Sequence, residues 1–446
     1  MFLTAQGALE ADLSGIIVGL DIGSAFIRVA IGELDLDNNI KIIGASKTPS
    51  KGVNNGVIIN SGAVEACIKE ALESAEQMAG VDVAYVYVSI GGSQVSTLNS
   101  SGQVGIDASS SPSRKNRITD VSEDAKKRAI AAAEAIYVPY EKRIIHTIPR
   151  EWIVDGISYK NGQVKDLIGT EGVRLEVKVH IVMATITALK KIDDTIMHLG
   201  YQRSGRTLKT LAAAVATLPR EDMELGSILI DLGAGTTDVM VIYDSAPVYT
   251  MSLPVGGWYV TNDIAQVKGI PFDVAEDIKI KYGCCWIDES EEDETVTIPG
   301  VGSRPPEETS RFELCQIIQS RMDEIFAMIK DSVRKHSGLT SLNGSIVLTG
   351  GGALMYGIVE LAQSAWHTTA VRKGEAPNLG DLDCGPLGRN VYRQPDFATA
   401  VGLVLANKGG AVAEKPSKKG SPRREDKSDV LGGLKNGVKE FWKKIF

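Results

Sequence analysis

The segment GLDIGSA at residues 19–25 is echoed later in the chain by LIDLGAGTTD at residues 229–238. In each segment an apolar strand is followed by Asp and one more apolar residue. Gly and a small residue come next, and a second strand then begins. Glycine lets the backbone of such a hairpin approach a ligand closely, and successive turn N–H groups can form a concavity that binds an anion. The two segments therefore predict a pair of phosphate-binding hairpins, with two ordinary glycine-containing turns as the alternative.

These hairpins supply the first candidate site residues. We expect a phosphate chain to be held by Gly23, Ser24, Ala25, Gly233, Ala234, Gly235, Thr236 and Thr237. Asp21 and Asp231 stand at the ends of the two strands. They suit Mg²⁺, which keeps part of its hydration shell and meets carboxylates through water. Two such hairpins facing each other would clamp a polyphosphate and its metal ion.

A third glycine-rich loop follows in the run IVLTGGGA at residues 346–353. It is predicted to join a buried strand to the start of a helix, an arrangement that brings backbone close to a phosphate or a planar ligand. One GGG turn is weak evidence by itself, but its position after the two hairpins strengthens it. The residues expected to contact ligand here are Gly350, Gly351, Gly352, Ala353 and Met355.

Hydrophobic periodicity places these loops in an α/β chain. Strands are predicted over residues 16–20, 26–32, 40–46, 84–90, 144–154, 175–185, 227–231, 238–243, 247–253 and 345–348. Helices are predicted over residues 63–79, 122–136, 188–200, 207–218, 258–268, 271–282, 310–335 and 397–406.

The order of two phosphate loops and a third, glycine-rich loop resembles the actin-like ATPase superfamily over residues 16–407. The resemblance implies an adenosine role for the third loop and ATP with Mg²⁺ as ligands. It also implies that Glu276 and Lys279, in VAEDIK at residues 274–279, touch ribose and adenine. The alternative is an exposed helix pair three residues apart, which adds little stability.

Within that superfamily the chain resembles the bacterial cell-division family FtsA. PGVGSRPP at residues 299–306 is similar to that family's PGVGGRPPR signature, and KIKYGC at 279–284 and TAVGL at 399–403 also look like it. The resemblance implies an actin-like (ribonuclease H-like) two-domain fold with four subdomains, a disordered linker and a C-terminal amphipathic helix. The irregular stretch at 93–168 lies where the family carries subdomain 1C.

The resemblance also implies a division of the chain into subdomains. Subdomain 1A would comprise residues 14–92, 169–206 and a return segment, 365–407; 1C residues 93–168; 2A residues 207–254 and 326–364; and 2B residues 255–325. A linker over residues 408–430 and a membrane-targeting helix over residues 431–446 would complete the chain.

Composition fits a globular body with a distinct tail. Hydrophobic residues make up 43% and charged residues 23%, close to globular averages. The five Cys are irregularly spaced without CxxC, which favours a reducing compartment. The acidic N-terminal stretch lacks the features of a signal peptide, and no apolar run is long enough to span a membrane.

The net charge of −8 is divided unevenly along the chain. Residues 408–446 carry eleven basic and five acidic side chains, a net charge of +6, so residues 1–407 carry a net charge of −14.

The tail ends in LGGLKNGVKEFWKKIF at residues 431–446, which predicts an amphipathic helix lying in a membrane interface. Its apolar residues fall in one arc and its lysines mostly lie outside that arc. The membrane contacts expected are Leu431, Leu434, Val438, Phe441, Trp442, Ile445 and Phe446, with Lys439, Lys443 and Lys444 facing anionic headgroups. Solubility alone could explain the basic charge, and a helix packed back on the body is the alternative structure.

Hydrolysis is predicted to be slow or absent. Actin-like filament ATPases carry a pattern close to Glu-Pro-x-Ala-Ala-Ala before the second phosphate loop, where this chain has KTLAAA at residues 209–214. Lys209 then stands where the water-orienting acid would be, and lysine is a poor base near neutral pH. The alternative is that Lys209 is a solvated helix residue.

The resemblance implies an ATP-binding scaffold, at most a slow ATPase, that polymerises on the cytoplasmic face of the membrane at the division septum. Its partners would be FtsZ through subdomain 2B, other copies of itself, inner-leaflet anionic lipids and later division proteins, with no nucleic acid. The rivals are another actin-like scaffold of the shape or pilus-assembly type, a metabolic kinase of the same fold, and a chaperone of the same fold. The five His show no ligand spacing, so we expect them to be structural.

Overall fold

Two five-stranded sheets of matching design form the body of the chain, for which a computed structural model describes residues 15–106, 119–160, 167–287, 294–300, 302, 305–338 and 343–408. The strands of the first sheet are β1 (Ile16–Ile22), β2 (Phe26–Leu34), β3 (Ile40–Pro49), β6 (Tyr85–Ile90) and β13 (Gln202–Leu208). Those of the second are β14 (Ser227–Leu232), β15 (Thr237–Tyr243), β16 (Ala246–Leu253), β19 (Ile346–Thr349) and β20 (Val371–Lys373).

The two sheets share one topology. In the first, β1, β2 and β3 form an antiparallel meander, and β6 and β13 then join β1 in parallel in the order β13-β6-β1-β2-β3. In the second, β14, β15 and β16 form the meander and β19 and β20 add in parallel, in the order β16-β15-β14-β19-β20. The hairpins β1–β2 and β14–β15 therefore occupy equivalent places, which agrees with the internal similarity of their sequences.

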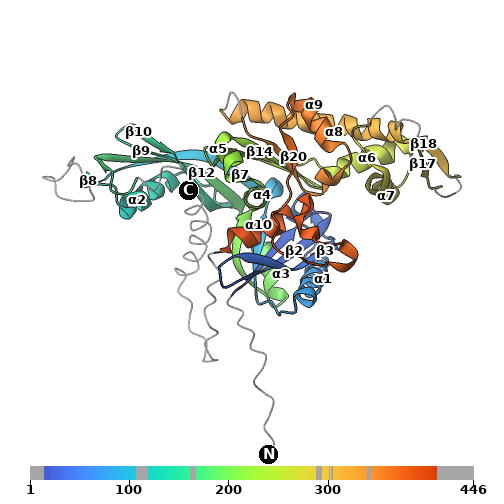
Figure 1. Cartoon of the computed structure of the whole chain (residues 1–446), viewed down its shortest axis with the longest axis horizontal. Coiled ribbons are helices and arrows are strands. Elements are labelled where there is room, and N and C mark those ends of the chain that lie inside the picture. The colour runs from blue at the N-terminus through green and yellow to red at the C-terminus, as the bar shows by residue number, and fades with distance from the viewer. Residues whose placement is uncertain are drawn as a thin grey trace, which may run out of the picture.

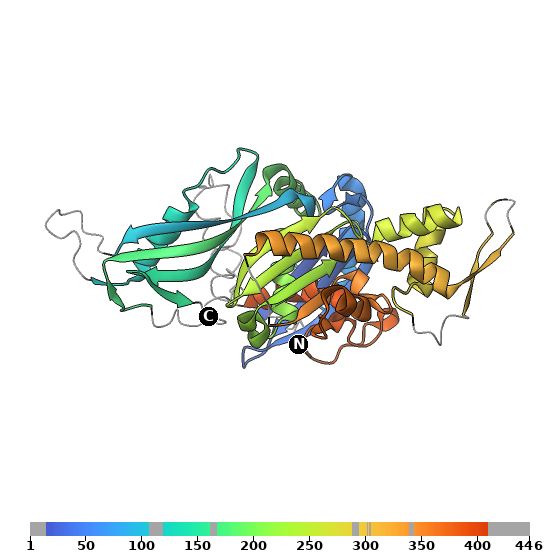
Figure 2. The ribbon, with the colours of Figure 1, turned by 90° about the horizontal axis from the view of Figure 1, so that it is seen from above.

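Helices fill the space between and outside the sheets (Figure 1). α1 (Ser61–Ala79) and α3 (Ile186–His198) pack against the first sheet, where their apolar faces form one core with β1, β2 and β6. α4 (Lys209–Thr217) and α10 (Ala398–Ala406) pack on each other between the sheets. α8 (Arg311–His336) and α9 (Ile358–Trp366) close the core of the second sheet, and α8 is the long orange helix that runs beside it in Figure 2.

A separate lobe extends from one side of the body (Figure 2). Its sheet has the order β10-β9-β12-β7, built from β7 (Val95–Gly105), β9 (Lys142–Val154), β10 (Ile157–Lys160) and β12 (Arg174–Thr185). α2 (Glu123–Glu134) packs on this sheet through alanines, and β8 (Thr119–Asp120) pairs with β11 (Glu171–Gly172) beside it. Because β12 pairs with both β7 and β9, the division at residue 168 cuts through this sheet, and the lobe continues to Thr185.

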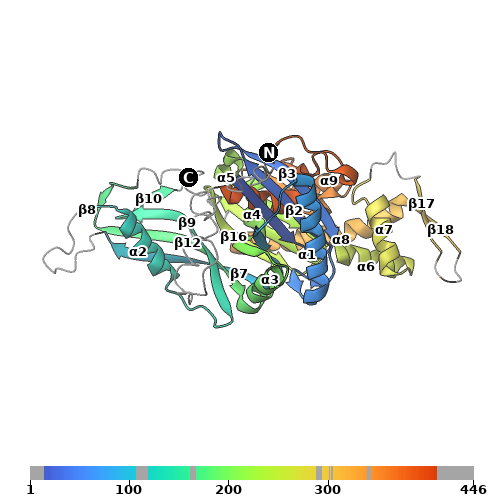
Figure 3. The ribbon, with the colours of Figure 1, turned by 90° about the horizontal axis from the view of Figure 1, so that it is seen from below.

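The opposite end of the molecule holds a smaller group of elements (Figure 3). It contains α6 (Gly257–Lys268), α7 (Phe272–Tyr282) and the ribbon of β17 (Thr295–Ile298) and β18 (Glu307–Ser310), from which α8 returns to the second sheet. The remaining elements are short: β4 (Val53–Asn54), β5 (Val57–Ile58), α5 (Arg220–Leu225), and 3₁₀ turns at Gly92–Gln94, Gly351–Leu354, Gly385–Leu387, Val391–Arg393 and Pro395–Phe397.

The predicted helices and strands are present, with ends shifted by a few residues. Three differences matter. Residues 202–208 form strand β13, so the helix predicted from residue 207 begins at Lys209. The irregular stretch after Gly92 contains the long strand β7, and the helix expected to start in the third glycine loop begins a few residues later, at Ile358, as α9.

Candidate functional site

The two hairpins end in the same tight turn. The Gly23 N–H donates to Phe26 O at 3.1 Å, and the Gly233 N–H donates to Thr236 O at 2.9 Å. A Cβ on Gly23 would lie 2.6 Å from Phe26 O, and one on Gly233 would lie 2.7 Å from Thr236 O. Only glycine fits at these two positions, which is why both sequences carry it after the strand.

The turns face each other across a cleft of about 500 Å³. Predicted residues from both hairpins line it: Gly23, Ser24, Gly233, Ala234, Gly235 and Thr236. Ala25 and Thr237 do not line it, and the Thr237 hydroxyl is already used, since it donates to Val255 O at 2.8 Å. The structure therefore brings two segments far apart in sequence to the walls of one cavity, as a polyphosphate clamp requires.

The second hairpin is fixed by the start of α6. The Gly257 N–H donates to Gly233 O at 2.9 Å, and the Trp258 N–H donates to Ala234 O at 2.8 Å. These bonds use the carbonyl oxygens of Gly233 and Ala234. They leave the hydrogen bond within the turn, from the Gly233 N–H to Thr236 O, in place. The position of this wall of the cleft is therefore coupled to α6.

Glu276 and Lys279 lie just behind that wall. Lys279 Nζ contacts Glu276 Oε2 at 2.7 Å, Thr261 Oγ1 at 2.8 Å and Gly257 O at 3.1 Å. The Lys279 side chain is only 10% exposed, and burial lowers its pKa while Glu276 opposes that change. The two residues do form the ion pair three positions apart that the alternative described, although the pair is largely buried, and neither residue lines the cleft. The pair joins α7 to the segment that holds the second hairpin.

The third glycine loop packs beside the second hairpin and does not line the same cleft. Gly350 has a φ of +80°, and a side chain there would overlap Asp231. A Cβ on Gly352 would lie 2.7 Å from Leu232 Cβ. Gly351 and Ala353 belong to the 3₁₀ turn Gly351–Leu354, with Ala353 fully buried, and Met355 follows that turn. These glycines permit the close approach of the loop to the end of β14.

Lys209 and Asp238 line the cleft, and the buried carboxylates of the predicted metal residues Asp21 and Asp231 lie near Lys209 without lining it. Asp21 accepts a hydrogen bond from Ser89 Oγ at 2.7 Å. Asp238 accepts from the Gly92 N–H at 3.2 Å and from Thr236 Oγ1 at 3.0 Å. Lys209 Nζ lies 3.0 Å from Asp231 Oδ2. The Lys209 side chain is 17% exposed, so the alternative of a solvated helix residue is wrong.

The charge of Lys209 is stabilised by its surroundings. Burial alone would lower the pKa of Lys209, but the carboxylates of Asp231, Asp21 and Asp238 outweigh burial and raise that pKa above its usual value. Lys209 is therefore an ammonium ion at neutral pH and cannot accept a proton from water.

The carboxylates fit a magnesium ion poorly. Asp21 is engaged by Ser89, and the ammonium of Lys209 stands beside Asp231. No cluster of three or more Asp, Glu, His or Cys suited to a metal occurs in the described part of the chain. Lys209 approaches Asp231 Oδ2 at ion-pair distance but not along a hydrogen-bond direction, so within the described residues this oxygen has no hydrogen-bond donor. The charge of this carboxylate is compensated by Lys209 Nζ, which lies 3.0 Å from it.

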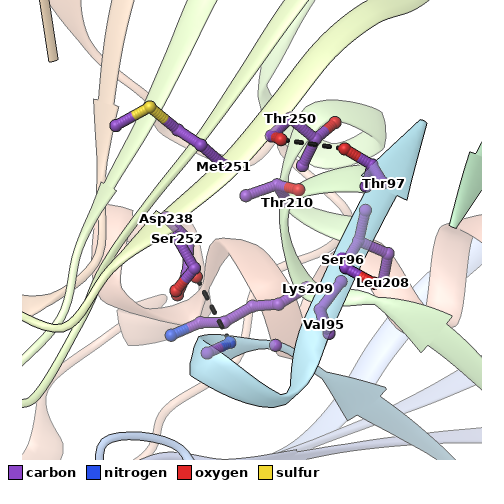
Figure 4. Close-up of a pocket in the computed structure, with 12 residues that line it drawn as sticks. Val95, Ser96, Thr97, Leu208, Lys209, Thr210, Asp238, Thr250, Met251 and Ser252 are labelled. Atoms are coloured by element: carbon purple, nitrogen blue, oxygen red, sulfur yellow. Dashed lines mark hydrogen bonds between the residues drawn. The ribbon is translucent and has the colours of Figure 1, made fainter. Parts of the chain in front are cut away.

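A second cavity of about 290 Å³ lies on the other side of Lys209 (Figure 4). It is bounded by the start of β7, the start of α4 and Thr250–Ser252 of β16. Lys209 and Asp238 border both cavities. The lysine thus stands where the first sheet, the second sheet and the lobe meet.

Several lining residues were not among the predicted ones. They are Ile22, Gly56, Ile58, Ser89, Gly91, Gly92, Gln94, Ile192 and Asp238, together with Lys209, which was predicted only to replace the water-orienting acid. Asp238 closes the second hairpin motif, and its place directly after Thr236-Thr237 was a usable signal. The Gly91-Gly92 pair at the end of β6 was a second one.

Comparisons with known proteins decide the family. The model for "Cell division protein FtsA" matches residues 228–402, and that for the SHS2 domain inserted in FtsA matches residues 92–183. The chain is 37% identical to the FtsA of Borreliella burgdorferi over 96% of this chain and 99% of that protein. It is 33% identical to the Pseudomonas aeruginosa protein over 95% of this chain and 97% of that one. The chain belongs to the FtsA family.

Membership confirms the family resemblance seen in the sequence and makes this an actin-like cell-division protein. The SHS2 match ends at residue 183, close to the end of β12, and so agrees with the lobe's sheet. Among solved structures, the PilM–PilN type IV pilus biogenesis complex aligns with a TM-score of 0.60 at 16% identity, over 89% of this chain and 99% of that one. That likeness supports the actin-like fold.

The predicted membrane residues lie outside the described part of the chain. They are Leu431, Leu434, Val438, Lys439, Phe441, Trp442, Lys443, Lys444, Ile445 and Phe446. Within the part that is described, no helix is long and apolar enough to cross a bilayer.

Proposed function

We propose that this FtsA-family protein binds ATP between its two hairpins and uses the nucleotide as a structural ligand. The observation that supports this most directly is the cleft of about 500 Å³, whose walls come from Gly23–Ser24 on one sheet and Gly233–Thr236 on the other. A ligand held by both walls would couple the two sheets. Its binding would then favour whichever arrangement of the domains brings the walls together.

Hydrolysis is proposed to be slow. A general base must lie within reach of the attacking water and be able to take its proton. The residue at the start of α4 is Lys209, which is held in its charged form by neighbouring carboxylates.

Magnesium usually accompanies ATP. The structure supports a magnesium site less well than a nucleotide site, because the ammonium of Lys209 stands beside Asp231.

Gly235 gives a test of nucleotide binding. A Cβ there would lie 2.8 Å from Asn55 Oδ1 and 3.0 Å from Ser24 Oγ, which belong to the opposite wall. We expect Gly235→Ala to hold the walls apart and to weaken ATP binding by about tenfold, equivalent to about 1.4 kcal/mol. Isothermal titration of the full chain with ATP measures it.

The matched control is Gly62→Ala on α1, where the new Cβ would meet only Asn60 Oδ1 at 3.9 Å. It should bind ATP like the wild type. Equal affinity in both variants, or no ATP binding by the wild type, would contradict the proposal. Turnover recorded on the same samples should stay slow throughout.

We further propose that the protein polymerises on the cytoplasmic face of the membrane and tethers FtsZ filaments to it at the division septum. Family membership supports FtsZ, self-association and later division proteins as partners. The composition of residues 431–446 supports contact with inner-leaflet anionic lipids, since a Lys-rich helix with Trp and Phe suits a bilayer interface. A single helix of this kind binds reversibly, whereas many on one polymer bind tightly through avidity.

The proposed subdomain division follows the sequence expectation, with the lobe extended from residue 168 to Thr185. FtsZ is assigned to the 255–325 region, which contains α6, α7, β17, β18 and the first turns of α8. The rival of another actin-like scaffold is disfavoured by identities of 30–37% to FtsA proteins against 16% to the pilus protein. A sugar kinase would need an acid aimed at its substrate. The residue at the start of α4, where a catalytic acid would be expected, is Lys209.

A further inference from the structure

Lys209 is the first residue of α4, and its side chain projects into a ring of carboxylates from three strands. Asp21 lies in β1, Asp231 in β14 and Asp238 in β15. All three are at most 4% exposed. Three buried carboxylates so close together repel one another unless a cation compensates them.

The ammonium is also close to the proposed phosphate-binding backbone. A Cβ on Gly233 would lie 3.9 Å from Lys209 Nζ, and a Cβ on Gly91 would lie 3.3 Å from Lys209 Cδ. The lysine stem therefore passes between Gly91 of the first sheet and Gly233 of the second, and its charged end borders the cleft. Figure 4 shows the Lys209 side chain extending beside Asp238.

A divalent metal bound with a polyphosphate neutralises charge on the phosphates and on nearby carboxylates. Lys209 places a permanent cation where both kinds of anion would meet. Resting on the proposed nucleotide binding, we propose that Lys209 is a resident cation of the site, which takes over part of the metal's role and makes ATP binding only weakly dependent on Mg²⁺. Because Lys209 Nζ lies 3.0 Å from Asp231 Oδ2, this carboxylate needs no metal ion to compensate its charge.

The experiment measures ATP affinity by titration of the full chain, once in excess Mg²⁺ and once in excess EDTA. In the wild type we expect the two dissociation constants to agree within about threefold. Lys209→Gln keeps a polar side chain of similar length without the charge, and its affinity should fall by about tenfold or more when Mg²⁺ is removed. Lys209→Arg keeps the charge and should behave like the wild type.

Lys69→Gln is the matched control, because Lys69 is an exposed residue of α1 and its loss changes the net charge equally. A second measurement needs no nucleotide: Mg²⁺ alone should raise the thermal midpoint of Lys209→Gln and leave that of the wild type and Lys69→Gln unchanged. This readout reports compensation of the three carboxylates directly.

A wild type that loses about tenfold or more of its ATP affinity in EDTA would overturn the inference and leave the proposed function standing. The wild type decides this even if Lys209→Gln does not fold. Absence of ATP binding in both conditions would overturn the proposed function and this inference together.

Discussion

Asp396 forms two salt bridges between the first sheet and the segment leading into α10. Arg28 Nη2 and Lys47 Nζ each lie 2.9 Å from Asp396 Oδ2, and the Asp396 side chain is fully buried. Burial alone would raise the pKa of Asp396, but the two cations outweigh it and hold that pKa below its ordinary value. The ionised carboxylate therefore stabilises the folded chain.

We predict that Asp396→Asn lowers the free energy of unfolding by about 3–5 kcal/mol at pH 7, because it leaves two cations facing a neutral amide. A lowered folded pKa gives stability that is present above the unfolded pKa of about 3.9 and is lost as pH falls through the folded value. Urea unfolding at pH 7 and in steps below pH 4 measures this. A difference between variant and wild type that stays constant over that range would contradict the account.

Two histidines lie where the lobe meets the body. His146 Nε2 accepts a hydrogen bond from the Leu208 N–H at 3.0 Å, directly before α4. His180 contacts Asn99 Oδ1 at 2.8 Å and Thr250 Oγ1 at 3.1 Å. Burial lowers the pKa of His146 to about 4, and burial with the charge of Arg150 lowers the pKa of His180 to about 3. Both are neutral in the folded chain.

The lowered values predict sensitivity to mild acid. Their contribution is complete above the unfolded pKa of about 6.5 and declines as pH falls toward the folded values, by about 2 kcal/mol per histidine at pH 5. Unfolding free energies at pH 7 and pH 5 should therefore fall more for the wild type than for the double variant His146→Gln/His180→Gln. An equal fall in both would show that other groups set the acid response.

Among individual residues, the sequence predicted the turn glycines but not the ion pairs of the charged side chains. Gly23 and Gly233 were identifiable because a tight turn after a strand leaves room only for glycine, a local constraint visible in the local sequence. The ion pair of Lys209 with Asp231 was not, because it depends on how α4 and β14 are packed, and neither local sequence contains that information.

At the scale of elements, α4 and α10 form the layer between the two sheets. A side chain at Gly402 of α10 would overlap the carbonyl of Ala212 in α4, and one at Gly19 of β1 would overlap the carbonyl of Ala400 in α10. Small residues thus let the two helices and β1 stack at close range. The TAVGL segment seen in the sequence has this packing role.

We predict that Gly402→Ala forces α10 and α4 apart and destabilises the chain by about 1–3 kcal/mol, the usual cost of overpacking. Because α4 begins with Lys209, ATP affinity should fall as well. Chemical denaturation and titration measure the two effects. Unchanged stability and affinity would mean that the α4–α10 contact is not tight.

Element prediction failed where the elements depend on their neighbours. β13 has the sequence QRSGRTL, which has too few apolar residues for a strand pattern, and it forms because it pairs in parallel with β6. The helix expected to start at the end of the third glycine loop begins only at Ile358, as α9, because a short 3₁₀ turn comes first. By contrast, α1 and α8 were clear from their helical spacing, since each buries one apolar face.

At the scale of the whole molecule, two sheets of one topology meet around a cleft, with the lobe on one side and the α6–α7 region on the other (Figures 1 and 3). The repeated hairpin sequences predicted the two matching halves. The lobe's boundary was missed at residue 168 because β12 pairs with strands that lie before it in the chain. Such pairings between distant segments leave no trace in local periodicity.

We propose that the body binds FtsZ while residues 431–446 bind the membrane. Co-sedimentation of FtsZ with anionic liposomes tests this proposal by comparing the full chain with a chain ending at Val430, each with and without ATP. We expect FtsZ to pellet with liposomes only when the full chain is present. Equal recruitment by the shortened chain, or no recruitment by the full chain, would contradict it.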